Sequence, residues 1–491
     1  MKTAGTIKNK KYVILFFALA LLCGLFPYTG DDWAWGSSIG IERLSTMFEG
    51  YSGRYLGNFI VLLLTRSNIL KTAAMALTIT AVVKCVEVIG RSGYSFCYAC
   101  LMLLLTPKLI FRQAIVWTAG FSNYCTSVAL VLIFLIFAVK DPEIREKKRA
   151  RIYAAGLLLL GFANSLIVEH ITLYSVILAA GLCVYSLATD KRNIAQYAAY
   201  FTGAAAGAAV MFSNSVYHNI SAGNDDYRSM AGTSSIINRA YSNYTDTIYF
   251  DGFFNNMFLN LSLLAIALLL YRKIRADRTA GTKLMKWMTL CLAVFAVFVI
   301  YSTFARVSFA QGDQPHALEL LDAVFAFAAL AAFLGYVIMA GYLNGDLRRV
   351  IILSLSITMI IAPLFVVTPI GSRCFFATYV LFILLGCVML DYTGADTASS
   401  DMTVKIALTA ILTLYCVYLA VFSVISITNK DRLDRAREAA AAGKKEVVFT
   451  ILPFDSFLWT AAPTEGIWAE RYKLFYGLPD DLTIIVKDRK G

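Results

Sequence analysis

Residues 12–36 read YVILFFALALLCGLFPYTGDDWAWG, an apolar run followed at once by two adjacent carboxylates and two tryptophans. No small-residue cleavage site follows the run, so we interpret it as an uncleaved first membrane helix and not as a signal peptide. The polar part then lies at a membrane–water boundary. Carboxylates are costly to bury there and are suited to chemistry on a membrane-bound substrate.

The rest of the chain repeats such apolar runs. Of its 491 residues, 59% are hydrophobic and only 15% are charged, whereas soluble domains carry roughly a quarter charged residues. We therefore predict an all-α polytopic membrane protein with about thirteen transmembrane helices. The stretch 56–64 is apolar but too short to span, so we expect it at the interface or re-entering. The predicted spans lie near 12–28, 70–90, 94–107, 124–140, 152–167, 171–189, 194–213, 257–271, 287–304, 320–341, 349–366, 373–390 and 404–427.

The net charge of +12 comes largely from Lys and Arg clusters in short loops, at 145–151 and 272–286. Short basic loops stay in the cytoplasm, so the charge is a topology signal, and we expect no nucleic-acid partner. The N-terminus is then cytoplasmic, and an odd number of spans places the C-terminus outside. The segments placed outside are rich in Asn, Tyr, Ser, Gly and Trp: 28–56, 107–123, 214–256, 303–319 and 367–373.

Two parts of the chain differ in kind. Residues 1–427 form the predicted transmembrane domain with its extracytoplasmic loops. Residues 428–491 form a small extracytoplasmic α/β segment, in which 431–442 has a helical pattern that Gly443 ends. Residues 447–451 and 483–486 have the composition of strands.

Several classes of chemistry lack their motifs in this chain. There is no P-loop, HExxH, GxSxG or dinucleotide fingerprint, so an enzyme of this build needs a substrate already activated in the membrane. The 10 cysteines lie almost wholly in apolar stretches and predict neither a zinc site nor a disulfide framework. Two adjacent carboxylates could hold a divalent ion with waters, but we expect no cofactor to be required.

The polar residues of the outer segments form the candidate site, each with a plainer alternative. Asp31 and Asp32 could be catalytic or could cap a helix; nothing in the sequence orders them, and we favour Asp32 slightly. Arg54 could bind phosphate or anchor the chain at the interface. Glu169 and His170, in a very short connection, could be functional or structural.

The remaining candidates follow the same reasoning. Trp33 and Trp35 could stack on a sugar ring or lie at headgroup level, and Trp117, Asn123 and Tyr124 could contact a sugar or simply pack a loop. Asn224 and Arg228 form either an ordinary turn or an acceptor or phosphate contact. An arginine at an outer boundary is unusual under the positive-inside bias, so both Arg306 and Arg373 are candidates for the phosphate of an anionic lipid.

These residues resemble an uncharacterised bacterial group of multi-spanning proteins, itself similar to the GT-C superfamily of membrane glycosyltransferases, which includes O-antigen-modifying glucosyltransferases. The chain departs from that pattern at Ala222, where a proline is expected, and at His170, where a small polar residue is more usual. The likeness covers most of the chain and rests on short motifs: Asp31-Asp32-Trp33, Gly53-Arg54-Tyr55, Trp117-x-x-Gly120-x-x-Asn123-Tyr124, Gly223-Asn224-x-x-x-Arg228, Pro369-x-x-x-Arg373 and Gly443-Lys444-Lys445-x-Val447-Val448.

The resemblance implies a GT-C-like enzyme of a bacterial inner membrane. Its donor would be a polyprenyl-phosphate-linked sugar and its acceptor an extracytoplasmic surface glycan. An acidic residue of the first outer loop would act as base or orient the acceptor, and transfer opposite the leaving group would invert the anomeric centre. The alternatives are a transporter or flippase of a lipid-linked glycan, or a polysaccharide polymerase or ligase.

Overall fold

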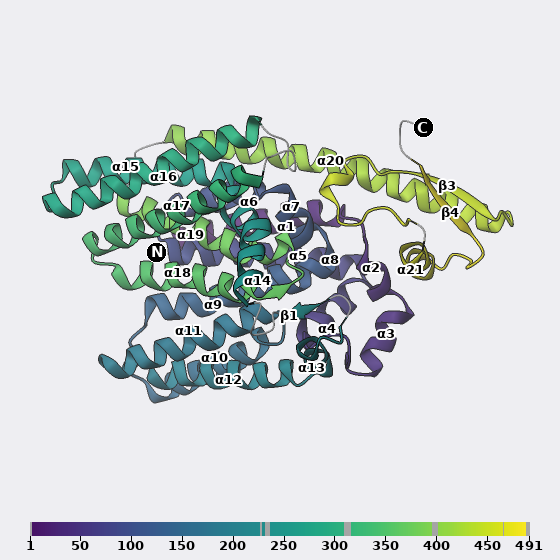
Figure 1. Ribbon diagram of the computed structural model, residues 1–491, viewed down its shortest axis with the longest axis horizontal. Coiled ribbons are helices and arrows are strands. Elements are labelled where there is room, and N and C mark those ends of the chain that lie inside the picture. Colours follow the sequence, from purple (N-terminus) through teal and green to yellow (C-terminus); the bar gives the residue numbers. More distant parts are fainter. Residues whose placement is uncertain are drawn as a thin grey trace.

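The computed structural model describes residues 2–225, 228–230, 236–308, 316–394, 401–464 and 466–487. It is a bundle of long helices with a smaller cap at one end (Figure 1). The long helices are α1 (Lys2–Gly24), α5 (Asn68–Gly90), α6 (Ser95–Leu104), α9 (Thr126–Lys140), α10 (Lys147–Asn164), α11 (Glu169–Ala188), α12 (Ile194–Phe212), α15 (Met257–Ala276), α16 (Thr282–Ser308), α17 (His316–Leu343), α18 (Leu347–Ile361), α19 (Phe376–Thr393) and α20 (Asp401–Ala441).

The predicted spans all overlap these helices. Within the described ranges, nine helical stretches are long and apolar enough to cross a membrane. A tenth would consist of α6 and the helical segment Lys108–Val116, which begins with α7 (Lys108–Phe111) and lies at 89° to α6. The protein is therefore an all-α, multi-pass membrane protein. The helices α1 and α10 carry several Lys and Arg near their starts, and α12 is rich in Ala and Gly. The count of thirteen spans stays a prediction.

Small residues set the packing of α10 against α12. A Cβ added at Gly161 of α10 would lie 2.5 Å from the carbonyl oxygen of Tyr200 in α12. A Cβ at Gly203 of α12 would collide with the carbonyl oxygen of Leu158 in α10. Glycine at these positions therefore lets the two backbones approach, as small residues do between membrane helices. By contrast, α19 lies at the centre of the bundle, with nearly every side chain buried.

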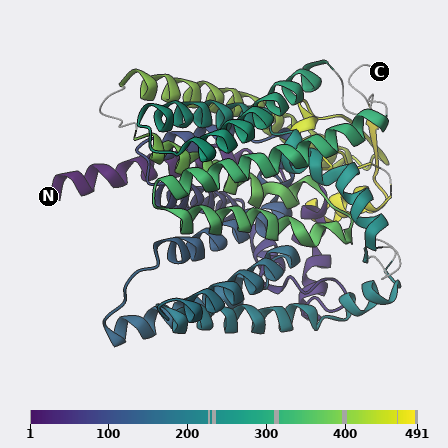
Figure 2. The ribbon, with the colours of Figure 1, turned by 60° about the vertical axis from the view of Figure 1, so that its left-hand side comes forward.

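The short elements gather at one end of the bundle, which we call the cap end (Figures 1 and 2). The connection between α15 and α16 and the N-terminus lie at the other end. The cap end carries α2 (Asp31–Gly36), α3 (Ser38–Ser45), α4 (Tyr55–Leu64), α8 (Thr118–Gly120), α13 (Ser215–Ala222), α14 (Ile236–Asn243), and the paired strands β1 (Ser229–Met230) and β2 (Val367–Thr368).

The C-terminal segment, residues 428–491, adds to the cap end. The helix α20 runs without a break past residue 428, where this segment begins, and ends at Ala441. Gly443 follows with φ of +66°. Next come β3 (Glu446–Thr450), α21 (Ile467–Tyr476) and β4 (Thr483–Lys487), and β3 pairs with β4 in parallel. Together with the end of α20, these elements form a small hydrophobic core that also includes Trp33 of α2. The other members of this core are Ala436, Ala439, Val447, Phe449, Tyr472, Leu478, Leu482 and Ile484.

Candidate functional site

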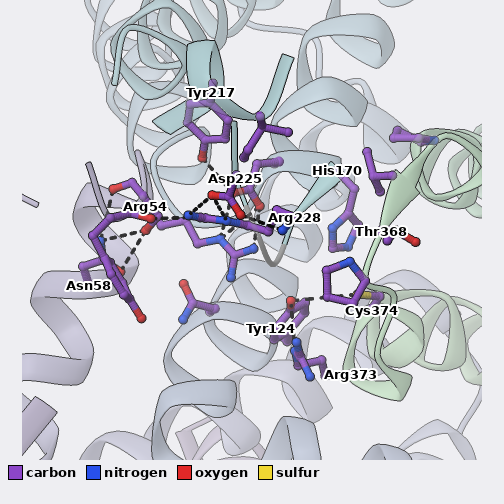
Figure 3. Close-up of a pocket in the computed structure, with 18 of the residues that line it drawn as sticks. Arg54, Asn58, Tyr124, His170, Tyr217, Asp225, Arg228, Thr368, Arg373 and Cys374 are labelled. Carbon is purple, nitrogen blue, oxygen red and sulfur yellow. Dashed lines mark hydrogen bonds and ion pairs between the residues drawn. The ribbon is translucent and has the colours of Figure 1, made fainter. Parts of the chain in front are cut away.

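A cavity of about 680 Å³ opens at the cap end. Its lining comes from segments that are far apart in the sequence. These segments are α2, α4, α11, α13, the π-helical turn Phe121–Cys125 and the connection between α18 and α19. Ten of the thirteen predicted site residues line this cavity: Asp31, Arg54, Trp117, Asn123, Tyr124, Glu169, His170, Asn224, Arg228 and Arg373. The structure therefore brings most of the candidate set to one place (Figure 3).

Arg54 and Glu169 form one wall of the cavity. The Arg54 guanidinium donates from Nε to Oε1 of Glu169 at 2.9 Å, and its Nη2 lies 2.8 Å from Oε2. Glu169 is the first residue of α11, where the helix dipole favours a carboxylate. Tyr217 of α13 donates to Oε1 at 2.7 Å. Burial, together with the neighbouring Glu169 carboxylate, raises the pKa of Tyr217, so its hydroxyl stays a donor.

Arg228 is held in a similar way. Its Nη2 lies 2.9 Å from Oδ2 of Asp225, and its Nη1 donates to the carbonyl oxygen of Tyr51 at 2.9 Å. The Asp225 carboxylate also accepts from the backbone N–H of Arg228 at 2.6 Å. The positive charges of Arg54 and Arg228 are thus each balanced by a carboxylate within the cavity wall.

Arg373 has a different environment. It donates from Nε to the hydroxyl of Tyr124 at 3.2 Å and from Nη1 to Oε1 of Gln113 at 3.1 Å, and both partners are neutral. Its guanidinium carbon lies 5.6 to 6.0 Å from the ring centroids of Trp117, Tyr124 and Trp459. No carboxylate among the described residues pairs with Arg373. A Cβ at Gly371 would lie 2.5 Å from its Nη1, so glycine there leaves room for the guanidinium.

Arg373 also stands at a helix start. The turn Ser372–Phe375 leads directly into α19. The N-terminus of a helix carries partial positive charge, which adds to that of the guanidinium. The site around Arg373 therefore suits an anion.

His170 faces the cavity beside Tyr124 (Figure 3). The two rings stack with centroids 6.0 Å apart, and His170 is 5% exposed. Its ring nitrogens make no hydrogen bond to any residue that the structure describes. They remain available to a ligand.

The two adjacent carboxylates of α2 have separate roles. Asp31 lines the cavity, and its Oδ1 lies 2.9 Å from Nη1 of Arg471 in α21. Asp32 is fully buried outside the cavity lining and accepts the backbone N–H groups of Thr29, Thr118 and Ala119 at 3.2, 3.2 and 2.9 Å. Burial raises the pKa of Asp32 to about 7, partly offset by these bonds. The slight preference for Asp32 as the reactive carboxylate stays a prediction, and the geometry favours Asp31, because Asp31 is the one that lines the cavity.

Two more predicted residues are not found in the lining. Trp33 packs in the core of the C-terminal segment, with its ring centroid 5.2 Å from that of Tyr472 and 1% of its surface exposed, so it offers no face to a sugar. Trp35, two residues later, lines the cavity instead. Arg306 lies near the end of α16, and its side chain is outside the part of the chain that the structure describes.

The structure adds polar residues to the lining that the sequence did not single out: Tyr51, Ser52, Asn58, Tyr217 and Asp225. Asn58 did carry a signal, because it is a polar side chain inside the short apolar stretch 56–64. Its Nδ2 donates to Ser52 Oγ at 3.1 Å. Tyr217 and Asp225 had no such signal in the sequence.

The described side chains include no cluster of three or more His, Cys, Asp or Glu residues that could hold a metal ion. Comparisons with protein families, with curated proteins and with solved structures give no match for this chain.

Proposed function

We propose that this protein is a membrane glycosyltransferase of the bacterial inner membrane, which moves a sugar from a polyprenyl-phosphate donor to a surface glycan outside the cytoplasm. One observation carries the proposal. Arg373, which has no carboxylate partner among the residues that the structure describes, and Asp31 line the same cavity. A sugar phosphodiester presents one negative charge to bind, and the acceptor presents one hydroxyl proton to remove.

In the proposed reaction the bond from the acceptor oxygen to the anomeric carbon forms as the bond from that carbon to the phosphate oxygen breaks. Asp31 takes the hydroxyl proton, and the lipid phosphate leaves with the bonding electron pair while Arg373 holds it. Attack opposite the leaving group inverts the anomeric centre. No metal is required for this charge balance.

The rest of the lining fits the other parts of such substrates. The ion pairs of Arg54 and Arg228 are charge-neutral and offer hydrogen-bonding groups to sugar hydroxyls. Leu173, Phe212 and Leu364 add apolar surface to the lining, which suits a prenyl chain. Trp35 and Trp117 offer aromatic faces for a sugar ring.

The test is a deletion strain whose surface glycan is analysed by mass spectrometry. The proposal expects loss of one side-branch sugar, restored by the wild-type gene and not by an Asp31→Asn variant expressed at the same level. Loss of the long chains would indicate a polymerase, a ligase or an exporter instead. An unchanged glycan would reject a role in its synthesis. Purified protein should then transfer labelled sugar from a polyprenyl-phosphate donor in vesicles, a reaction that a transporter does not perform.

A further inference from the structure

The C-terminal segment contacts residues of the cavity lining at two separate points. Arg471 of α21 pairs with Asp31 across 440 positions of sequence, and the two side chains are 16% and 32% exposed. Trp459 lies beside Trp117, with ring centroids 5.7 Å apart, and its centroid is 6.0 Å from the guanidinium carbon of Arg373. The segment thus contacts both groups to which the proposed reaction assigns charge.

Apolar packing fixes these contacts. Trp33, two residues after Asp31 in α2, is buried against Tyr472, which follows Arg471 in α21. On the other side, Gly30 has φ of +56° and lies close enough that a Cβ there would be 3.2 Å from Thr460. The positions of Arg471 and Trp459 are therefore set by a packed interface, and not only by a surface ion pair, which alone contributes little.

We infer that Arg471 and Trp459 are positioning residues of the transfer site, an inference that rests on the proposed function. Arg471 fixes the direction of the Asp31 carboxylate at the cavity wall. Trp459 backs Trp117 and keeps the guanidinium of Arg373 over aromatic faces. Both act through another residue, and the C-terminal segment is thereby a component of the site.

Steady-state kinetics on the full-length protein in vesicles test this inference. We expect Arg471→Ala to lower kcat per folded molecule by about 10-fold to 100-fold, with the donor KM changed less than about threefold, because a misdirected base affects the transition state. Trp459→Ala should raise the donor KM by about 3-fold to 30-fold, because the guanidinium of Arg373 loses one of the aromatic rings that hold it in place. Loss of folded protein alone would leave kcat and KM per folded molecule unchanged.

Conservative variants and a matched control complete the design. Arg471→Lys and Trp459→Phe should regain most of the lost function. Arg435 forms an ion pair with Asp431 in the same segment, and its side chain is 43% exposed. Arg435→Ala removes this exposed pair and should have the kcat and KM of the wild type. Wild-type kinetics in Arg471→Ala or Trp459→Ala, or conservative variants no better than alanine, would overturn the inference.

A second measurement does not depend on transfer. If the wild type transfers no sugar, the proposed function has failed, and amide hydrogen exchange then tests the docking. Arg471→Ala should raise exchange in residues 30–36 relative to Arg435→Ala, because the carboxylate at the start of α2 loses its partner. Equal exchange in the two variants would overturn the positioning role of Arg471.

Discussion

Arg54 and Glu169, 115 positions apart in the sequence, form a two-point ion pair with Nε 2.9 Å from Oε1 and Nη2 2.8 Å from Oε2. The pair joins the start of α4 to the first turn of α11. Tyr217 adds a third element, α13, through its bond to Glu169. Three segments of the cavity wall therefore meet at one carboxylate.

Removing that carboxylate should destabilise the protein. Glu169→Gln leaves Arg54 without its partner, and we expect a loss of about 1–2 kcal/mol, less than for a fully buried pair because the side chains are 29% and 26% exposed. The measurement is thermal unfolding in detergent. The double variant Arg54→Gln with Glu169→Gln should recover part of the loss. As control, Glu143→Gln breaks a pair whose side chains are 84% and 58% exposed and should have almost no effect. Equal losses at both pairs would contradict the prediction.

The two aspartates of α2 should respond differently to the same substitution. Asp31→Asn should leave the unfolding temperature near that of the wild type and reduce transfer by about 10²-fold to 10⁴-fold, as expected for a missing general base. Asp32→Asn should lower stability by about 1–3 kcal/mol, because the amide cannot accept all three backbone N–H groups that now bind the carboxylate. Activity and unfolding are measured on the same preparations. A stable, inactive Asp32→Asn with an active Asp31→Asn would reverse the assignment.

Asp32 should also make stability depend on pH. Its pKa is raised to about 7 in the folded protein, above the value of about 3.9 in an unfolded chain. Between these two pKa values the folded state binds more protons than the unfolded state. The free energy of unfolding therefore falls as the pH rises towards 7, by at most about 1.4 kcal/mol per pH unit. Thermal unfolding from pH 5 to pH 8 should show the gap between wild type and Asp32→Asn narrowing. A gap that widens with pH would show that the shift has the opposite sign.

Arg373 should control donor binding. Arg373→Gln removes the charge, and we expect the donor KM to rise by about 10-fold to 100-fold, the range for a lost charge-assisted bond. Arg373→Lys keeps the charge but loses the planar fork, so its defect should be intermediate. Arg192→Ala, an exposed arginine paired with Asp190 away from the cavity, serves as the control. If Arg373→Gln bound the donor as tightly as the wild type, the phosphate would have to lie elsewhere.

The orientation of the bundle can be measured directly. Ser456 is exposed in the C-terminal segment, and Lys148 is exposed near the start of α10. In a background with Cys416 replaced by serine, Ser456→Cys should react with an impermeant maleimide in intact spheroplasts. Lys148→Cys should react only after the membrane is permeabilised. The opposite pattern would place the cavity on the cytoplasmic side and exclude an extracytoplasmic acceptor.

Much of the fold could be predicted because the membrane imposes a simple pattern on the sequence. Each apolar run predicted as a span overlaps a helix, and the basic cluster 272–286 lies at the end of the bundle opposite to the cavity. Because each span crosses the membrane, the polar residues at its ends lie at one of the two membrane surfaces. Polar residues that end spans on the same side therefore come close together. This is why Arg54, Glu169 and Arg373 could be grouped without a structure.

The sequence could not distinguish neighbours within a short helix. Consecutive residues of a helix point about 100° apart, so one of two adjacent aspartates can face a cavity while the other faces backbone amides. Two of the three amides that bind Asp32 belong to Thr118 and Ala119, 86 and 87 positions away, and no local pattern in the sequence indicates them. Trp33 and Trp35 separate for a related reason, because the partner of Trp33 is a core built by the last part of the chain.

That shared core has a consequence for biosynthesis. Trp33 is translated long before Phe449, Tyr472 and Ile484, with which it shares that core. The segment around α2 is therefore made long before its tryptophan is covered and Asp31 meets Arg471. In a nascent chain that has not yet reached α21, Trp33 is uncovered and Asp31 lacks Arg471, although Cys374, the last described residue of the cavity lining, has already been made. An uncovered tryptophan is a surface that membrane quality-control proteases can recognise. Folding of the C-terminal segment and fixing of the Asp31 side chain are thus a single event.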